Sequence, residues 1–268
     1  MSTSLRARRV MVTGASGALG RATATALRAR GATVCGLDLV ACDGVIPCDV
    51  RDQNSVATAV VQAREQMGGI DSAVHFAGIG LPTSAGDAPG DAVMRTLDVN
   101  LLGAWRVTAA CIDELVAHRG RLVFVASELA YATLPLAAAY TVSKRGLTAY
   151  ADSVRAEYGS HVGVTTVYPG YIRTAIHDAG IAAGLSLESM TRPQSAGDVA
   201  ATVVRALTAT HQPRDTACAA LGRFELAAAR HLPGVVDAVI RRRLRREVAS
   251  GGYTTAPLAA AMRNRLGF

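Results

Sequence analysis

The sequence is nearly without lysine: Lys144 is the single one, against 27 arginines. Apolar runs are also short, and none reaches 18 residues, so no transmembrane helix is predicted. The five cysteines form no C-x-x-C pair, and the six histidines follow no ligand spacing such as H-E-x-x-H. These absences argue against a disulfide framework and against a metal site. The first ten residues, MSTSLRARRV, lack the apolar segment of a signal peptide, so a cytoplasmic location with reduced thiols is expected.

The charge of the chain is unevenly placed. Of the 268 residues, 50% are hydrophobic and 18% charged, which is typical of a folded chain long enough for one α/β domain over residues 1–268. The net charge of +7 comes mainly from residues 230–268, where eight arginines face only Asp237 and Glu247. Because the rest of the chain is almost neutral, no basic face for nucleic acid is predicted.

The N-terminal segment has the pattern of a β-α-β unit. A short apolar strand, Arg9–Thr13, is followed by a helical pattern from Leu19 to Arg30 that stops at Gly31, and then by a strand that ends in Asp38. The turn between the first strand and the helix reads Gly14-Ala15-Ser16-Gly17-Ala18-Leu19-Gly20. Glycines allow a tight turn and the close approach of a pyrophosphate to the helix N-terminus, and an acidic residue about 20 positions on can bind a ribose diol. This unit predicts a dinucleotide site.

A second pattern brings a hydroxyl, a phenol and an ammonium together. The apolar run Leu122–Ala126 predicts a buried strand that ends at Ser127, and a helical pattern follows that contains Tyr140 and Lys144 one turn apart. A neighbouring cation favours the phenolate and lowers the pKa of a tyrosine, which suits a general acid or base. The alternative is a helix surface that happens to carry one tyrosine and one lysine. The single lysine favours the functional interpretation, because arginine supplies the surface charge elsewhere in this chain.

Taken together, these motifs resemble the short-chain dehydrogenase/reductase superfamily over about residues 8–207. The resemblance rests on Thr13-Gly14…Gly20, Asn100, Ser127, Tyr140-x-x-x-Lys144 and Pro169-Gly170…Thr174. It implies a Rossmann-like, doubly wound parallel sheet of about seven strands flanked by helices. It also implies that Tyr140 is the catalytic acid/base, that Ser127 holds the substrate oxygen, and that Lys144 binds the nicotinamide ribose and lowers the pKa of Tyr140. Asn100 would anchor a water in the proton relay, or it could simply bridge helix backbone.

The same resemblance implies a set of cofactor-binding residues. Asp38 would bind the adenosine ribose, Asp49 and Val50 the adenine, and Thr174 the nicotinamide amide. NAD is expected over NADP, because the Asp38 carboxylate would face the 2′-phosphate, although Arg9 and Arg21 flank the turn and could reach a phosphate. The full set is Gly14, Ser16, Gly17, Ala18, Leu19, Gly20, Asp38, Asp49, Val50, Ala77, Gly78, Tyr140, Lys144, Pro169, Gly170, Ile172 and Thr174.

Two motifs depart from the usual pattern of the compact members. The glycine turn reads T-G-x-x-G-x-x-G, a spacing closer to that of the extended members, which include epimerases and dehydratases. His75-Phe76-Ala77-Gly78 stands where the family commonly has Asn-Asn-Ala-Gly. His75 could be catalytic, but an ordinary histidine at the end of the strand Ala73–Phe76 is the favoured interpretation.

The last third of the chain predicts a cover for the site and a basic extension. Residues 175–192 are small and glycine-punctuated, with apolar residues that suggest a substrate lid or, alternatively, an ordinary surface helix pair: Ile176, Ile181, Leu185, Leu187 and Met190. Within the extension 230–268, Pro233–Val248 predicts a basic amphipathic helix. Its apolar stripe, Val236, Ile240, Leu244 and Val248, could pack on a second subunit or on the pocket, rest on a membrane, or leave the arginines to an acidic ligand.

The reading that follows from the resemblance is an NAD(H)-dependent oxidoreductase. It would interconvert a secondary alcohol and a ketone on a small-to-medium lipophilic substrate. The alternatives are an epimerase or dehydratase that uses transient oxidation, and a dinucleotide-binding regulator without turnover. A homodimer or homotetramer is expected, with the helices around Ala92–Glu114 and Ala138–Tyr158 at the interface.

Overall fold

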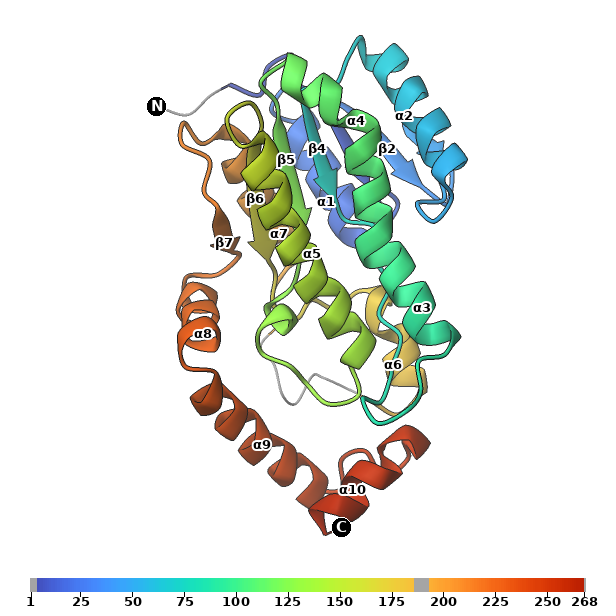
Figure 1. Ribbon diagram of the computed structural model, residues 1–268, viewed down its shortest axis with the longest axis vertical. Helices are drawn as coiled ribbons and strands as arrows, with labels where there is room; N and C mark the ends of the chain where they lie inside the picture. The colour runs from blue at the N-terminus through green and yellow to red at the C-terminus, as the bar shows by residue number, and fades with distance from the viewer. Residues whose placement is uncertain (1–3, 186–192, 268) are drawn as a thin grey trace.

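The computed structural model describes residues 4–185 and 193–267, and their strands form one parallel sheet flanked by helices (Figure 1). The strand order is β3-β2-β1-β4-β5-β6-β7, so the order reverses between β1 and β4. This confirms the predicted doubly wound, Rossmann-like class with about seven strands. The strands are β1 Arg9–Thr13, β2 Thr33–Asp38, β3 Val45–Pro47, β4 Ser72–His75, β5 Arg121–Val125, β6 Gly163–Tyr168 and β7 Asp215–Ala217.

The helices cover both faces of the sheet. In Figure 1, α4 and α5 lie in front of the strands and α1 behind them. The helices are α1 Ala18–Arg28, α2 Gln53–Met67, α3 Asp91–Leu97, α4 Ala104–Ala117, α5 Ala138–Tyr158, α6 Asp178–Ala182, α7 Ala196–Thr208, α8 Ala220–His231, α9 Pro233–Ala249 and α10 Ala260–Leu266. A π-helical segment, Asp98–Gly103, joins α3 to α4, and short 3-10 turns lie at Glu128–Ala130, Ala175–His177 and Pro257–Ala259.

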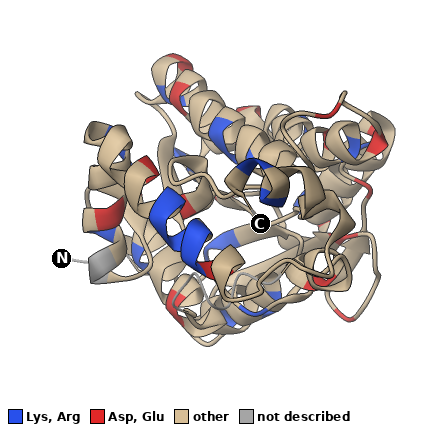
Figure 2. Cartoon of the chain, turned by 90° about the horizontal axis from the view of Figure 1, so that it is seen from below, with Lys and Arg blue, Asp and Glu red and all other residues tan. Residues whose placement is uncertain are grey.

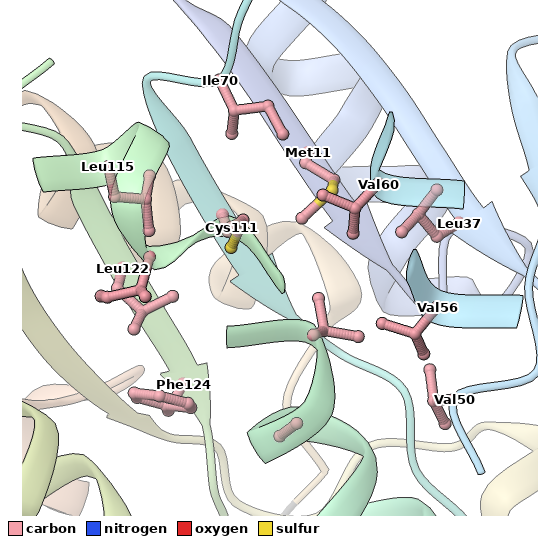
Figure 3. Close-up of a cluster of buried hydrophobic side chains, with 14 of the residues drawn as sticks. Met11, Leu37, Val50, Val56, Val60, Ile70, Cys111, Leu115, Leu122 and Phe124 are labelled. Carbon is pink, nitrogen blue, oxygen red and sulfur yellow. The ribbon is translucent and has the colours of Figure 1, made fainter. Parts of the chain in front are cut away.

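The central strands are apolar on both sides because both sides are covered. Val10, Met11 and Val12 are successive residues of β1, and all three are fully buried. Successive side chains of a strand point to opposite faces, so Met11 packs with the α2–α4–α5 layer, while Val10 and Val12 pack with the α1–α7 layer. Figure 3 shows the first of these cores, in which Met11 lies near Val60 and Leu122 near Phe124.

The predicted first helix ends slightly earlier than the sequence pattern indicates. Its last regular residue is Arg28, and Gly31 follows in the left-handed region with φ of 82°. Backbone N–H groups of Gly31 and Ala32 donate to the carbonyl oxygens of Arg28 and Leu27, at 2.9 and 3.2 Å. This is the hydrogen-bond pattern of a glycine-terminated helix, and Gly31 lies three residues beyond the last regular residue, Arg28.

Beyond β7 the chain leaves the sheet and forms an arm, residues 218–267, that returns beneath the site (Figure 1). The predicted basic helix is α9, and two residues of its apolar stripe, Leu244 and Val248, are buried. After α9 the arm contacts the lid region: Ala256 and Ala259 form a buried cluster with Leu185. The C-terminal half of the stripe is therefore buried within this chain, whereas Val236 and Ile240 are half-buried. Within the described residues, no helix combines the length and apolarity needed to cross a bilayer.

Candidate active site

A cavity of about 480 Å³ opens at the carboxyl ends of the central strands. Its walls come from the glycine turn after β1, from the segments that follow β4, β5 and β6, and from the start of α6. In open α/β sheets, ligands bind outside the carboxyl ends of the strands, where the strand order reverses. The lining includes these predicted residues: Gly14, Gly17, Ala18, Leu19, Gly20, Gly78, Ser127, Tyr140, Lys144, Pro169, Gly170, Ile172 and Thr174.

The glycine turn is shaped for the close approach of a phosphate group. Gly14 has φ of 65°, and a Cβ there would lie 2.7 Å from the Ala77 nitrogen; a Cβ on Gly20 would collide with the Gly14 carbonyl oxygen. The following helix α1 has Gly17 as its N-cap and no side-chain cap, so its first N–H groups remain available. A pyrophosphate fits this combination of bare backbone and helix N-terminus. The residues present therefore fit a nicotinamide dinucleotide.

Asp38 ends β2 beside this turn. One carboxylate oxygen, Oδ2, accepts a hydrogen bond from the Ser16 backbone N–H at 2.9 Å, and the Ser16 hydroxyl donates to the carbonyl oxygen of Val40 at 2.8 Å. Asp38 is half-buried and has no basic partner among the described residues. Its position agrees with the predicted ribose site, although Asp38 and Ser16 lie beside the cavity and are not part of its lining.

Three other predicted cofactor contacts and one flanking arginine lie outside the cavity lining. The Asp49 carboxylate pairs with Arg51 at 2.6 Å, and Val50 is buried where a Cβ on Gly103 would touch it. Their contact with adenine stays a prediction, as does that of Ala77, whose N–H donates to the Thr13 hydroxyl at 3.2 Å. Arg9 lies at the start of β1, away from the glycine turn, and its guanidinium pairs with Asp71 at 2.6 Å. The idea that Arg9 could reach a cofactor phosphate is therefore wrong.

Ser127, Tyr140 and Lys144 converge as predicted. Ser127 is the extended residue that follows β5 and Ala126, and its hydroxyl oxygen accepts from the Leu129 N–H at 3.2 Å. Tyr140 and Lys144 lie on the first two turns of α5. The Lys144 ammonium is buried and donates to the carbonyl oxygen of Val125 at 2.9 Å, and it lies 5.8 Å from the centre of the Tyr140 ring.

The acidity of these groups differs from the prediction. Burial raises the pKa of Tyr140 to about 12, and the hydrogen bond with Ser127 opposes this rise. Burial also lowers the pKa of Lys144 to about 8. The lowering of the Tyr140 pKa that was expected from Lys144 is absent in this geometry, where desolvation of the phenolate is the largest cause and the opposing contribution comes from Ser127. At neutral pH, Tyr140 holds its proton.

Asn100 occupies the π-helical segment and is fully buried. Its amide nitrogen donates to the Ile79 carbonyl oxygen and to the Ser143 hydroxyl, each at 2.9 Å, and its oxygen accepts from the Ile79 N–H at 2.8 Å. Ser143 in turn donates to the Tyr140 carbonyl oxygen at 2.7 Å. The side chain therefore ties the segment after β4 to the helix that carries Tyr140, as in the bridging alternative. Its water-binding role stays a prediction.

His75 is an ordinary buried histidine, as favoured from the sequence. Its ring stacks on Phe124 with centroids 5.1 Å apart, and Nε2 lies 3.1 Å from the Thr108 hydroxyl. Burial, with the nearby Lys144 charge, lowers the pKa of His75 to about 3, so the ring stays neutral. His75 is not part of the described cavity lining, whereas its neighbour Phe76 is.

The predicted lid is only partly described, and residues 186–192, with Leu187 and Met190, lie outside the described residues. Ile176 lines the cavity, but Ile181 is exposed to solvent. Leu185 packs on Ala256 and Ala259 of the arm and not on the cavity. Ile176 thus takes the position expected of a lid residue, whereas Leu185 is covered by the arm, which comes later in the chain. That the segment acts as a substrate lid stays a prediction.

Several lining residues were not predicted, and Glu128 is the one that carries a charge. It directly follows Ser127, and its backbone N–H donates to the Pro169 carbonyl oxygen at 2.9 Å. Burial, with repulsion from Glu225 on α8, raises the pKa of Glu128 to about 7, opposed by a hydrogen bond with Gln194. The signal in the sequence that could have identified Glu128 as a lining residue is its position directly after Ser127. The other unpredicted lining residues include Leu81, Leu129, Leu134, Tyr171 and His177.

The raised pKa of Glu128 predicts a pH-dependent difference in stability. The pKa rises from its usual 4.5 to about 7 on folding, so the native state binds this proton more tightly than the unfolded chain does. As the pH rises from about 4.5 to about 7, the wild type should lose stability relative to the Glu128→Gln variant, with no further change above that range. Thermal unfolding of both proteins across this range measures the difference. A difference that does not vary with pH would contradict the assignment, and Glu225→Gln, which removes the repulsion, should shrink it.

Comparison with known proteins gives a consistent result. A family model described as "short chain dehydrogenase" matches residues 8–182. The chain is 32% identical over 170 residues to "Dehydrogenase/reductase SDR family protein 7-like" of Anopheles gambiae, covering 61% of this chain and 54% of that protein. It is 34% identical over 141 residues to "Oxidoreductase UcpA" of Escherichia coli K12, covering 52% and 53%. The chain thus spans about half the length of these curated relatives.

Two solved structures share the fold. The ligand-free aldohexose dehydrogenase of Thermoplasma acidophilum matches with a TM-score of 0.72 and 24% identity, covering 81% of this chain and 93% of that one. A short chain dehydrogenase from Burkholderia cenocepacia J2315, solved in complex with NADP, matches with a TM-score of 0.74 and 24% identity, covering 90% and 100%. At these identities the likeness supports the fold alone.

Proposed function

The chain belongs to the short-chain dehydrogenase family, and from that premise we propose that it is an NAD(H)-dependent oxidoreductase that interconverts a secondary alcohol and a ketone. The observation that carries the proposal is one cavity that joins the glycine turn to Ser127, Tyr140 and Lys144. A dinucleotide held at the glycine turn would place its reactive end beside a hydroxyl, a phenol and a buried ammonium. These groups suit the binding of a carbonyl oxygen and the movement of its proton.

The roles of the side chains follow from their positions. Gly14, Gly17 and Gly20 would hold the pyrophosphate, Asp38 the adenosine ribose, and Lys144 the nicotinamide ribose. Bound NAD(H) supplies or accepts the hydride at the substrate carbon. Ser127 and Tyr140 hold the substrate oxygen, and Tyr140 donates its proton to that oxygen as the ketone is reduced. Because the pKa of Tyr140 is about 12, its proton is in place at neutral pH, while alcohol oxidation gains from higher pH.

The substrate side of the cavity favours a lipophilic molecule. Leu81, Leu129 and Leu134 line it together with Ile176 from the lid. Apolar walls with few polar groups are typical of sites for apolar ligands. We therefore assign a small-to-medium lipophilic alcohol or ketone as the substrate.

A substrate screen tests the proposal. Purified protein is mixed with a panel of secondary alcohols and ketones, each with NAD(H) and with NADP(H), and the absorbance of the reduced nicotinamide is followed. We expect turnover of lipophilic members, with NAD(H) preferred. Cofactor binding without turnover of any member would instead favour the dinucleotide-binding regulator.

An epimerase or dehydratase remains the second candidate because of the T-G-x-x-G-x-x-G spacing. Such an enzyme re-reduces its cofactor in every cycle and gives no net change in nicotinamide absorbance. Product analysis by chromatography with cofactor in catalytic amounts separates the two. Conversion of substrate without net oxidation or reduction would support this second candidate over the first.

An exposed apolar surface supports self-association. Met94, Leu102 and Trp105 on the α3–α4 helix, and Val142 on α5, are each more than 40% exposed. These helices are the ones expected at a dimer or tetramer interface, and exposed apolar patches of this kind mark interaction sites. We assign a homodimer or homotetramer through this face. Light scattering of wild type and Val142→Glu measures it, and unchanged mass would argue against the α5 part of the face.

The basic helix α9 also offers a face to solvent. Val235 and Val239 are exposed there, and the arginines of α9 lie on the side of the molecule seen in Figure 2. We expect a cytoplasmic protein in which this face can touch anionic membranes, since basic helices bind them through charge and apolar contact. Co-sedimentation with anionic vesicles at low salt, reversed by high salt, is the expected result. No sedimentation at low salt would exclude this contact.

A further inference from the structure

A second hollow of about 340 Å³ lies between the arm and the segment that precedes α5. Its lining is mostly apolar, with Ile240 and Leu244 contributed by the stripe of α9. Asp237 and Arg241, one turn apart and opposite in charge, also belong to the lining. The remaining lining residues are Ala85, Thr133, Leu134, Pro135, Leu136 and Ala138.

Leu134 is the residue that both hollows share. It lines the 480 Å³ cavity and the 340 Å³ hollow, and it is itself nearly buried. The other described lining residues belong to one hollow or the other. A single leucine side chain therefore forms the common wall between the candidate active site and the space beneath α9.

The segment that carries this wall is held in place from the side of Thr83. The Thr83 N–H donates to the Leu136 carbonyl oxygen at 2.9 Å, and the Thr83 hydroxyl accepts from the Ala139 N–H at 2.8 Å. Leu136 has φ of 61°, a left-handed conformation that a branched side chain adopts only when its surroundings require it. The hollow is therefore bounded by a fixed segment on one side and by a helix on the other.

The hollow opens to solvent, and its lining is mainly apolar with a few polar residues. Exposed apolar surface rimmed by polar residues is typical of a ligand groove. The charges of Asp237 and Arg241 offset each other, so the hollow does not select a charged ligand end. Its chemistry matches an uncharged aliphatic chain.

We propose that this hollow is the distal part of the substrate site, in which the aliphatic chain of a lipophilic alcohol or ketone passes Leu134 and lies against Ile240 and Leu244. The proposal rests on the proposed function, because it places the reacting carbon at Ser127 and Tyr140. A dinucleotide would fill the glycine-turn end of the first cavity, so a longer substrate needs space elsewhere. Because Leu134 borders both hollows, the shortest route for the substrate chain into the second hollow runs past Leu134. The arm is thereby a determinant of substrate length.

A homologous series of ketones tests this inference. Straight-chain methyl ketones from 2-butanone to 2-dodecanone are assayed with NADH and NADPH on the full chain, on Ile240→Trp and on Val239→Trp. Ile240→Trp fills the hollow, while Val239→Trp, the matched control, places the same ring at the neighbouring exposed position. Each buried methylene is worth about a fourfold gain in kcat/KM. We expect Ile240→Trp to match the wild type on 2-butanone and to lose about tenfold or more on 2-dodecanone, with Val239→Trp unchanged throughout.

The outcomes separate this inference from the proposed function. Equal losses on short and long ketones, or no loss on 2-dodecanone, would overturn the distal site while leaving the oxidoreductase intact. If the wild type reduces no ketone, the proposed function fails, and calorimetric binding of 2-dodecanol still decides the site. Tighter binding to wild type than to Ile240→Trp, by about tenfold, supports the site; equal affinities overturn it. Leu134→Ala, which removes most of the side chain between the two hollows, should favour 2-dodecanone over 2-butanone relative to the wild type.

Discussion

Replacement of Tyr140 by phenylalanine is expected to lower kcat by about 10²–10⁴-fold, the usual contribution of a positioned acid or base. The variant keeps the ring and loses only the hydroxyl that would give its proton to the substrate oxygen. Because the glycine turn and Asp38 are untouched, the affinity for NADH should change little. Steady-state kinetics measures kcat, and fluorescence titration of NADH measures affinity.

Tyr171→Phe is the matched control for this prediction. Tyr171 lines the same cavity but comes from the segment after β6 and not from α5. Its loss of a hydroxyl should leave kcat within about one power of ten of the wild type, below the range of acid/base catalysis. A Tyr140→Phe variant that keeps more than about a tenth of the wild-type kcat would show that Tyr140 is not the acid/base.

The second large effect concerns the cofactor, and it depends on Asp38. A carboxylate there can accept hydrogen bonds from both ribose hydroxyls of NAD, and it would repel the 2′-phosphate of NADP. A like-charge juxtaposition can cost several kcal/mol, so kcat/KM should favour NAD by about 10²-fold or more. The structure strengthens the physical basis for this preference, because Arg9 is engaged by Asp71 at the other end of β1 and is not available to a phosphate.

Two variants sharpen the cofactor test. Asp38→Asn removes the charge but keeps an oxygen that can accept from the Ser16 N–H, as Asp38 does at 2.9 Å. Asp38→Ala removes both the charge and the accepting oxygen. If the ratio of kcat/KM with NAD to kcat/KM with NADP falls equally in the two variants, the preference for NAD is due to the charge. Arg21→Ala tests the one flanking arginine that is left near the turn. Equal kcat/KM for NAD and NADP in the wild type, or an unchanged ratio in Asp38→Asn, would show that Asp38 does not face the ribose.

Local sequence was sufficient for the elements that carry their own signals. β1 and β5 are short apolar runs that end at polar or glycine residues, and their predicted ends lie within one residue of the observed ones. The helix α9 was also correctly placed, because its apolar period is set by helix geometry alone. The π-helical turn at Asp98–Gly103 was not predicted, because a one-residue change in hydrogen-bond spacing leaves no periodic trace over six residues.

The four-residue spacing of Tyr140 and Lys144 by itself determined that these two side chains lie on one face of a helix, because that face is set by helix geometry. Their acidity was decided only by the tertiary structure. Burial raises the pKa of Tyr140 to about 12 and lowers that of Lys144 to about 8. This burial is produced by helices and strands that are far apart in the sequence, so a short segment does not reveal it. The same holds for Glu128, whose pKa responds to Glu225 on a helix far along the chain. It holds also for the stripe of α9: the sequence determines that an apolar face exists, but only the folded chain decides that Leu134 and the segment before α5 lie against it.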